Sequence, residues 1–352
     1  MTQALVPAPA PAGLPARSVP SGPRRVLRAV AVASCLPYLS LKLAWIAGSR
    51  VGIPDGSSLL DHRGVMVVAN TVTVLMDAAV IVLALLLTQA WGRRTPAWLL
   101  VLPMWAATGL LTPIMAGFPA QLAVRALGGS GSGADTGREP FLDEWVFGVV
   151  YGGFILQGLS LGLLFALYAR DRWGHVGRGR VRELAPAGRA ARWCAVAAAA
   201  LALYPAVLRL LWACGSTAGL DAARAAERTS DFSVLQVLEA GYLAAAAAGG
   251  LMLAFRWGRA LPARVPLALA WLGSGAVACW AAWLSVTSLG PVDEVTERPT
   301  AATLLSYAVQ MIIGVLVVAV GVRSLRAGAG AGERVAGGAR PGEGRAAGGG
   351  GA

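Results

Sequence analysis

Apolar residues are gathered into eight runs along the chain, and short polar segments separate them. A helix needs about 20 mostly apolar residues to cross the hydrocarbon core of a bilayer. The first run is too long for a signal-peptide core and is followed by no small-residue cleavage site, so it too is expected to span the membrane. The pattern predicts an all-α integral membrane protein. Its eight transmembrane helices are expected at 26–48, 65–90, 97–117, 144–169, 191–214, 232–255, 265–286 and 301–322.

The segments outside these runs differ in composition. Residues 1–24 are rich in Pro and Ala and lack hydrophobic periodicity, and residues 323–352 are mainly Gly, Ala and Arg. Both are predicted to be disordered tails. A basic stretch at 170–190 separates a first group of four runs at 25–169 from a second group at 191–322.

The two groups repeat one another in sequence. The stretch 36–49 recurs at 203–216, and each copy has a proline near its start, one cation, a Trp three residues later, and Gly-Ser three residues after that. Several further matches follow in the same order, some of them without a gap. They pair Trp91, Gly92, Arg93 and Pro96 with Trp257, Gly258, Arg259 and Pro262, Trp105 and Gly109 with Trp271 and Gly275, and Tyr151 and Gly158 with Tyr307 and Gly314.

This repetition predicts two four-helix repeats. Four is an even number, so both copies would insert in the same orientation. They would then be related by a pseudo-two-fold axis along the membrane normal, as in transporters with parallel repeats. The alternative is chance agreement of Trp and Gly in helices that are rich in Ala and Leu.

Composition supports a membrane location and indicates its orientation. The chain is 56% hydrophobic and 14% charged, with a mean hydropathy of +0.62, which is too apolar for a soluble domain. A net charge of +12 indicates nucleic acid only when the basic residues form a soluble face, whereas here they lie beside apolar runs. The lipid bilayer, and not nucleic acid, is therefore the expected partner.

The basic residues alternate in density from loop to loop. The tails and the loops after the second, fourth and sixth runs hold 21 of the 29 arginines, and the other loops hold 12 of the 18 acidic residues. The positive-inside rule then places both termini in the cytoplasm. Heavy use of Ala, Gly and Arg is typical of GC-rich bacterial genomes, so the inner (plasma) membrane is expected. The basic segment at 170–192 is interpreted as a topology signal, with binding of anionic lipid headgroups as the alternative.

Four charged residues lie inside the predicted spans away from their ends, a cation on the first helix and an acid on the second helix of each group: Lys42, Asp77, Arg209 and Glu239. Intramembrane charges mark functional sites, although structural ion pairs also occur. At about 1.5 Å per residue, Arg209 and Glu239 lie roughly 7 and 10 Å from the outer ends of their helices. They are predicted to form a structural pair. Asp77 would lie about 18 Å deep and Lys42 about 9 Å, so these two are not expected to touch directly.

Polar residues extend the charges into three stripes at helical spacing, in the second, sixth and eighth runs. The stripes contain Asn70, Thr73 and Asp77; Ser233, Gln236 and Glu239; and Thr303, Ser306 and Gln310. Together they could line a cavity that opens outward, or they could form interhelical hydrogen bonds in a tight bundle. The residues assigned as candidates for substrate binding or proton coupling are Lys42, Asp77, Asn70, Thr73, Gln236 and Gln310.

Motifs for other chemistry are missing from the sequence. The four cysteines have neither disulfide-scaffold nor zinc spacing, and there is no phosphate-binding loop or dinucleotide fingerprint. We therefore assign no catalytic residue, metal or cofactor. The leading hypothesis is a permease or exporter of a small-molecule substrate. The alternatives are a non-catalytic signalling or assembly subunit and a membrane enzyme that acts on a lipid.

Overall fold

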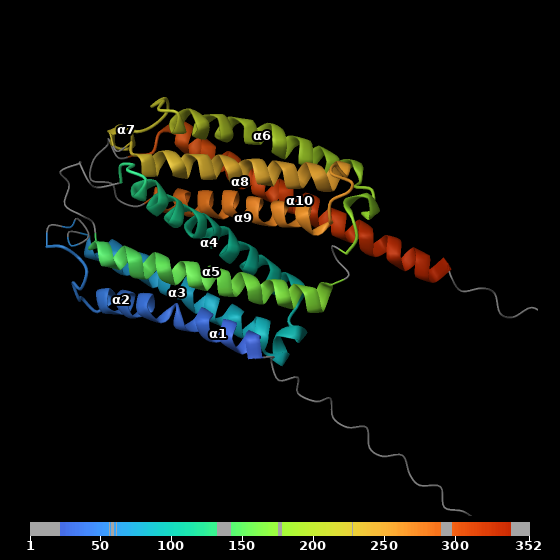
Figure 1. Ribbon diagram of the computed structural model, residues 1–352, viewed down its shortest axis with the longest axis horizontal. Coiled ribbons are helices and arrows are strands. Elements are labelled where there is room, and N and C mark those ends of the chain that lie inside the picture. Colours follow the sequence, from blue (N-terminus) through green and yellow to red (C-terminus); the bar gives the residue numbers. More distant parts are fainter. Residues whose placement is uncertain are drawn as a thin grey trace, which may run out of the picture.

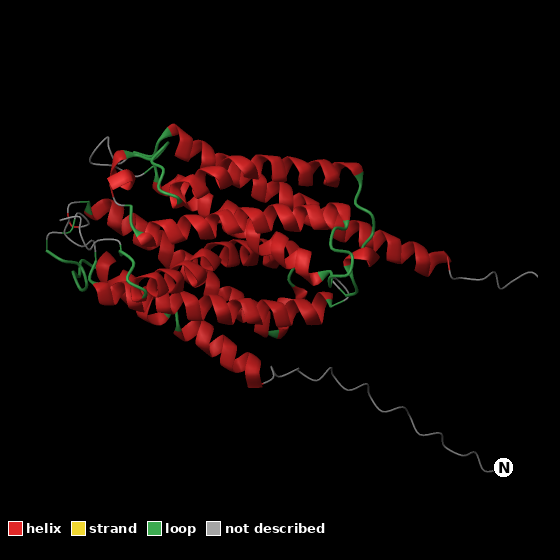
Figure 2. Cartoon of the chain, turned by 45° about the horizontal axis from the view of Figure 1, so that its top comes forward, coloured by secondary structure: helices red, strands yellow, loops and turns green. Residues whose placement is uncertain are grey.

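The computed structural model describes residues 22–55, 57, 60, 62–131, 142–174, 178–226, 228–289 and 298–338, with side chains up to residue 327. This part of the chain is helices joined by loops (Figure 2). The long helices are α1 (Gly22–Ala33) and α2 (Leu36–Ile46), which together form one span, α3 (Arg63–Thr88), α4 (Ala97–Ala126), α5 (Glu144–Trp173), α6 (Arg189–Ala213), α8 (Ser230–Phe255), α9 (Arg264–Thr287) and α10 (Ala301–Gly338). The short elements are η2 (Ala90–Arg94), η3 (Val181–Glu183) and α7 (Ala222–Ala226).

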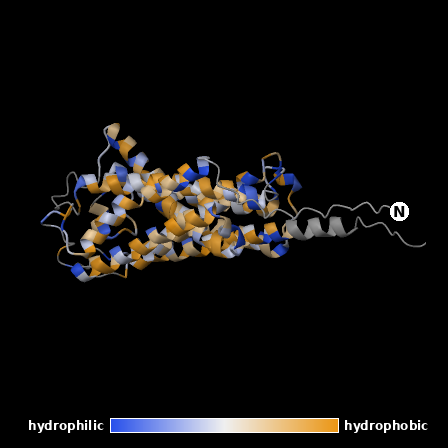
Figure 3. Ribbon diagram, turned by 90° about the horizontal axis from the view of Figure 1, so that it is seen from below, coloured by the Kyte–Doolittle hydropathy of each residue, from blue (hydrophilic) through white to orange (hydrophobic). Residues whose placement is uncertain are grey.

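Eight of the helical segments are long and apolar enough to cross a membrane, which confirms the prediction of an all-α chain with eight candidate spans. The hydropathy of their residues varies along the bundle in the way expected for a protein that spans a bilayer. Apolar residues cover the middle of the bundle, and hydrophilic residues gather at its two ends (Figure 3). By helix composition, the chain is a multi-pass membrane protein.

The first span is broken where a single helix was expected. Pro37 has no N–H and cannot donate to the carbonyl four residues earlier, so α1 ends at Ala33 and α2 begins at Leu36. Ser34 and Cys35 form the turn between them, and both side chains donate to the carbonyl of Ala31. Pro205 occupies nearly the same place in the second group, yet α6 continues through it.

Three helices extend four residues or more past their predicted C-terminal ends. α4 continues nine residues past position 117, α5 reaches Trp173, and α10 continues to Gly338. Disorder is predicted from Arg323 onward, but residues 323–338 are helical, and residues 339–352 lie outside the described ranges. Extending an existing helix avoids the cost of nucleation, and Ala, Leu, Arg and Glu favour the helix. These terms offset the low helix propensity of the five glycines in 323–338.

The helices form two groups with α4 lying obliquely between them (Figure 1). In the second group, α6 packs on α8 and α10, and α9 packs on α8 and α10, so the four helices form a closed ring. In the first group, α5 packs on α1, α2, α3 and α4, and α3 packs on α1 and α2. The contact between α3 and α4 is slight, and this ring is open on that side.

Glycines explain the tight packing of α8 on α9. A Cβ on Gly249 would lie 2.4 Å from the backbone nitrogen of Ala270, and one on Gly273 would lie 2.4 Å from that of Ala246. No side chain fits at either position. Small residues let helix backbones approach closely, which is how membrane helices gain packing energy without a hydrophobic driving force between them.

The two groups meet at a crossing of α4 and α9. Gly109 lies against the backbone of Gly275, where a Cβ would approach a carbonyl oxygen to 2.4 Å. Beside this contact, Trp105 Nε1 donates to Ser274 Oγ at 3.0 Å, and Trp271 Nε1 donates to Thr108 Oγ1 at 2.9 Å. The two bonds are reciprocal, because each helix gives one indole donor and one hydroxyl acceptor.

The basic linker between the groups folds onto the second group. Val181 donates its backbone N–H to the carbonyl of Leu261 at 2.9 Å, and Ala263 donates to Gly179 at 3.0 Å. These bonds hold η3 against the loop between α8 and α9.

Candidate functional site

A cavity of about 480 Å³ lies inside the first group, bounded by α2, α3, α4 and α5 and closed on one side by α9. Its walls are mostly apolar and aromatic. The polar residues that line it are Tyr38, Lys42, Asn70, Thr73, Asp77, Tyr151 and Gln157. A mainly apolar cavity with a few convergent polar groups is the usual form of a small-molecule site.

Helix α3 brings three polar side chains to this cavity because their spacing of three and four residues puts them on one face. Lys42, from α2, meets this face and donates a hydrogen bond to Thr73 Oγ1. The Thr73 hydroxyl in turn donates to the backbone within α3, so its lone pair is available to the lysine. Lys42 Nζ also lies 4.0 Å from the centre of the Tyr38 ring, a cation–π arrangement.

Asp77 lies one turn further along α3 and is 4% exposed. The Gln157 side chain of α5 is close enough to hydrogen-bond with its carboxyl group. The other carboxyl oxygen, Oδ2, is buried without a hydrogen-bond partner in the described part of the chain. No ion pair of 4.0 Å or less joins Lys42 to an acid among those residues. Both charges are therefore buried in the same cavity without neutralising each other by contact.

Aromatic rings form much of the remaining wall. Phe154 meets Tyr38 edge to face, with 4.8 Å between ring centres, and α9 contributes Trp280 and Trp283. Gln157 and these rings were not predicted from the sequence. The available signal for Gln157 was a lone amide in the fourth apolar run.

The second group treats its cation differently. Arg209 is 5% exposed, and its Nη2 lies 2.8 Å from Glu239 Oε2 while its Nη1 donates to Gln236 Oε1 at 2.9 Å. Gln310 is also buried and donates to Ser306 Oγ at 3.0 Å. Of the six assigned candidates, four line the cavity of the first group, whereas Gln236 and Gln310 lie outside it. The three polar stripes do not converge on one cavity.

The repeated stretch forms the same cap at the end of both first helices. Trp45 Nε1 donates to the carbonyl of Val51 at 2.8 Å, and Trp212 Nε1 donates to that of Ala218 at 2.8 Å. Gly48 and Gly215 follow with φ of 97° and 103°, the left-handed conformation that favours glycine. The Trp and Gly of the repeat thus end a helix, and its cation is positioned one turn before the cap.

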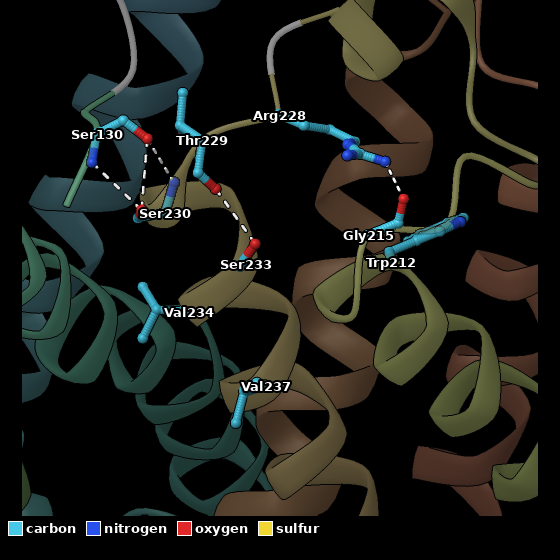
Figure 4. A pocket seen from close by; sticks show the side chains of 9 residues that line it. All are labelled: Ser130, Trp212, Gly215, Arg228, Thr229, Ser230, Ser233, Val234 and Val237. Atoms are coloured by element: carbon cyan, nitrogen blue, oxygen red, sulfur yellow. Dashed lines mark hydrogen bonds between the residues drawn. The ribbon is translucent and has the colours of Figure 1, made fainter.

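A second hollow of about 480 Å³ lies among the loops at the end of the second group (Figure 4). Its polar groups bond to one another: Arg228 donates to the carbonyl of Gly215, and the backbone N–H of Ser130 donates to Ser230 Oγ at 3.2 Å. Below it, Arg125 of α4 pairs with the buried Asp231 of α8. These contacts join the two groups, so the intramembrane cavity is the stronger candidate for a ligand site.

No group of three or more His, Cys, Asp and Glu side chains that could hold a metal occurs in the described ranges. The chain matches no protein-family model, no curated protein and no solved structure.

Proposed function

We propose that this protein is a small-molecule permease or exporter of the bacterial plasma membrane, and that its substrate occupies the cavity of the first group. One observation carries the proposal. Lys42 and Asp77 are buried in one cavity and are not paired with each other. An isolated charge in an apolar setting is costly, so a purely structural role favours direct pairing.

Arg209 is the internal reference for that argument. It contacts an acid at 2.8 Å and does not line the cavity of the first group, as a structural pair requires. We propose that Arg209 and Glu239 stabilise the second group, with Gln236 completing the network. Lys42 and Asp77, aided by Asn70 and Thr73, would bind the substrate or the coupling proton. Gln310 would serve as a buried hydrogen-bonding partner of the second group.

We further propose that the two groups are parallel repeats related by a pseudo-two-fold axis. The reciprocal bonds of Trp105 and Trp271 and the matching caps at Trp45 and Trp212 support this relation. The axis would pass close to the Gly109–Gly275 contact. Two glycine backbones touch at this crossing, which would let one group rock against the other around the substrate, the motion of many transporters.

Both termini are proposed to face the cytoplasm, which predicts opposite accessibility for two exposed loop positions. In a variant lacking the four native cysteines, Gly188→Cys should be protected from an impermeant thiol reagent added to intact cells. Thr217→Cys, at the other end of α6, should react. Labelling of Gly188→Cys from outside would show that the orientation is opposite to the one proposed.

The transport proposal is tested by untargeted mass spectrometry of cells and medium from strains that produce the protein. The wild type should redistribute at least one small molecule across the membrane. The Lys42→Met/Asp77→Asn variant should not, at equal amounts in the membrane. Glu183→Gln, which changes an exposed acid on the linker, is the matched control and should act as wild type. If the double variant behaves as wild type, the cavity is not a transport site and a signalling or assembly role becomes the better explanation.

A further inference from the structure

We propose that the cavity of the first group binds a zwitterion with an apolar body, such as an aromatic amino acid or a compound of that kind. The anionic group would lie on Lys42 and the ammonium group on Asp77. The inference names the substrate class of the proposed transporter and rests on that proposal only in placing a ligand in this cavity.

Asp77 supplies the first half of the argument. Asp77 lines the cavity, and its Oδ2 atom is buried and accepts no hydrogen bond among the described residues. A carboxylate oxygen removed from water needs a donor, and a charged N–H donor gives the strongest such bond. Gln157 occupies only part of the acceptor capacity of this carboxyl group. A ligand ammonium at this position would complete it.

Lys42 supplies the second half. An ammonium group carries three donors, and one of them is used by Thr73. The Tyr38 ring faces the charge but accepts no conventional hydrogen bond. Within the described ranges, no carboxylate lies within ion-pair distance of Nζ. An anionic group of the ligand would neutralise this cation from the cavity side.

The distance between the two anchors favours both charges on one small molecule. Thr73 marks the position of the lysine ammonium, and Asp77 follows one helical turn later, a rise of about 6 Å. An amino group and a carboxylate on the same carbon can bridge such a gap through one hydrogen bond at each end. A ligand with a single charge would satisfy one anchor and be repelled by the other.

The apolar part of the cavity wall is the reason to expect a ligand with an apolar body. Away from the two charges, the cavity is lined by rings such as those of Phe147, Phe154 and Trp283 and by aliphatic side chains of α4. Its volume of about 480 Å³ lies within the roughly 300–1,000 Å³ of small-molecule sites. Aromatic and aliphatic groups of a ligand would be removed from water there, which favours binding in proportion to the area buried.

The experiment measures binding to the purified full-length protein in detergent by titration calorimetry, with three matched probes: L-tryptophan, tryptamine and indole-3-propionate. The last two lack the carboxylate and the amine, respectively. L-phenylalanine and its two counterparts form a second series. The zwitterion should bind at least about tenfold more tightly than either singly charged analogue, because each loses one charge-assisted bond. Equal binding of an analogue, or no binding by any probe in either series, would overturn the proposal.

Variants of Asp77 and Lys42 test which charge of the ligand each residue binds. Asp77→Asn should remove the advantage of tryptophan over indole-3-propionate, and Lys42→Met should remove its advantage over tryptamine. Ala106→Phe, which fills the cavity without touching either charge, should weaken all three probes. Glu183→Gln, an acid-to-amide change on the exposed linker and outside the cavity, is the matched control and should keep the selectivity. The wild-type selectivity tests the ligand class, and the variants that remain monodisperse on size-exclusion chromatography test its place in this cavity.

Binding and transport can fail separately in this design. Zwitterion selectivity in detergent without any redistribution in cells would retain the ligand class and reject transport. Redistribution that depends on Lys42 and Asp77, together with equal binding of the singly charged analogues, would retain transport and reject the ligand class.

Discussion

The two four-helix groups share a helix cap and a cation position, but the cation meets different partners in each group. Lys42 and Arg209 each lie three residues before the capping Trp of their helices and are almost fully buried. Arg209 reaches a glutamate at 2.8 Å, whereas the contacts of Lys42 within the described ranges are a threonine and a tyrosine ring. The same cation position thus has different partners in the two groups, because the second helix of each group places different side chains opposite it.

Packing between the second and third helices of each group explains the difference. Extending the Trp-Gly-Arg match in both directions without a gap pairs Gly249 with Leu83 and Ala270 with Met104. In the second group the small pair brings α8 and α9 into backbone contact. In the first group both side chains are large and buried, the contact between α3 and α4 is slight, and Leu83 borders the cavity, so we infer that this bulk keeps the two helices apart. Side-chain size at these two positions is therefore the difference that we connect with an open ring in the first group and a closed ring in the second.

The largest expected effect comes from giving the second group the bulk of the first. Gly249→Leu would place side-chain atoms where the backbone of Ala270 lies, so α8 and α9 must separate. We expect destabilisation at or above the ~1–3 kcal/mol that is typical of overpacking. The measurement is the yield and thermal stability of the monodisperse protein in detergent. Gly241→Leu, where a Cβ meets nothing within 4 Å, is the control. Equal behaviour of the two variants would contradict this account of the packing.

The next largest effect concerns the Arg209–Glu239 contact. Arg209→Leu and Glu239→Leu should each leave one buried charge without its partner, at a cost on the order of 3 kcal/mol. The side chain of Glu239 is 20% exposed, so its charge keeps some access to solvent when Arg209 is removed. The loss of stability therefore falls toward the lower end of the usual range. The double variant should recover much of the stability. Additive losses in this double-mutant cycle would show that the two residues are not coupled.

The helices and the buried charges could be predicted from the sequence, but the cavity between the helices could not. Apolar run length predicts eight spans, and an ionisable residue stands out in such a run. The approach of Gln157 to Asp77 depends on how α5 is rotated against α3, which no pattern within either helix determines. The slight contact between α3 and α4 depends in the same way on residues from separate helices. Such pairwise packing becomes visible only when the partner of each face is known.

The first group should respond less in stability and more in activity. Because Lys42 borders a cavity, Lys42→Met should change stability by no more than about 1 kcal/mol, less than the change expected for Arg209→Leu. A lysine in an apolar site can release its proton near neutral pH, whereas an arginine stays charged. If Lys42 exchanges a proton during transport, Lys42→Arg should fold normally and lose at least about tenfold in substrate redistribution. Full activity of Lys42→Arg beside an inactive Lys42→Met would show that the residue is a fixed charge.

The smallest expected effect tests whether the two groups are symmetric where they meet. Trp105→Phe and Trp271→Phe each remove one indole donor at the α4–α9 crossing and keep an aromatic ring in place. A hydrogen bond of this kind contributes about 0.5–1.5 kcal/mol. A pseudo-two-fold axis through the crossing makes the two sites equivalent, so the two losses of thermal stability should agree within measurement error. The acceptors give an independent comparison, because Thr108→Val and Ser274→Ala break the same two bonds from the other side. A marked difference between Trp105→Phe and Trp271→Phe, reproduced by their acceptor variants, would mean that the crossing is not symmetric and that the parallel-repeat proposal fails at its centre.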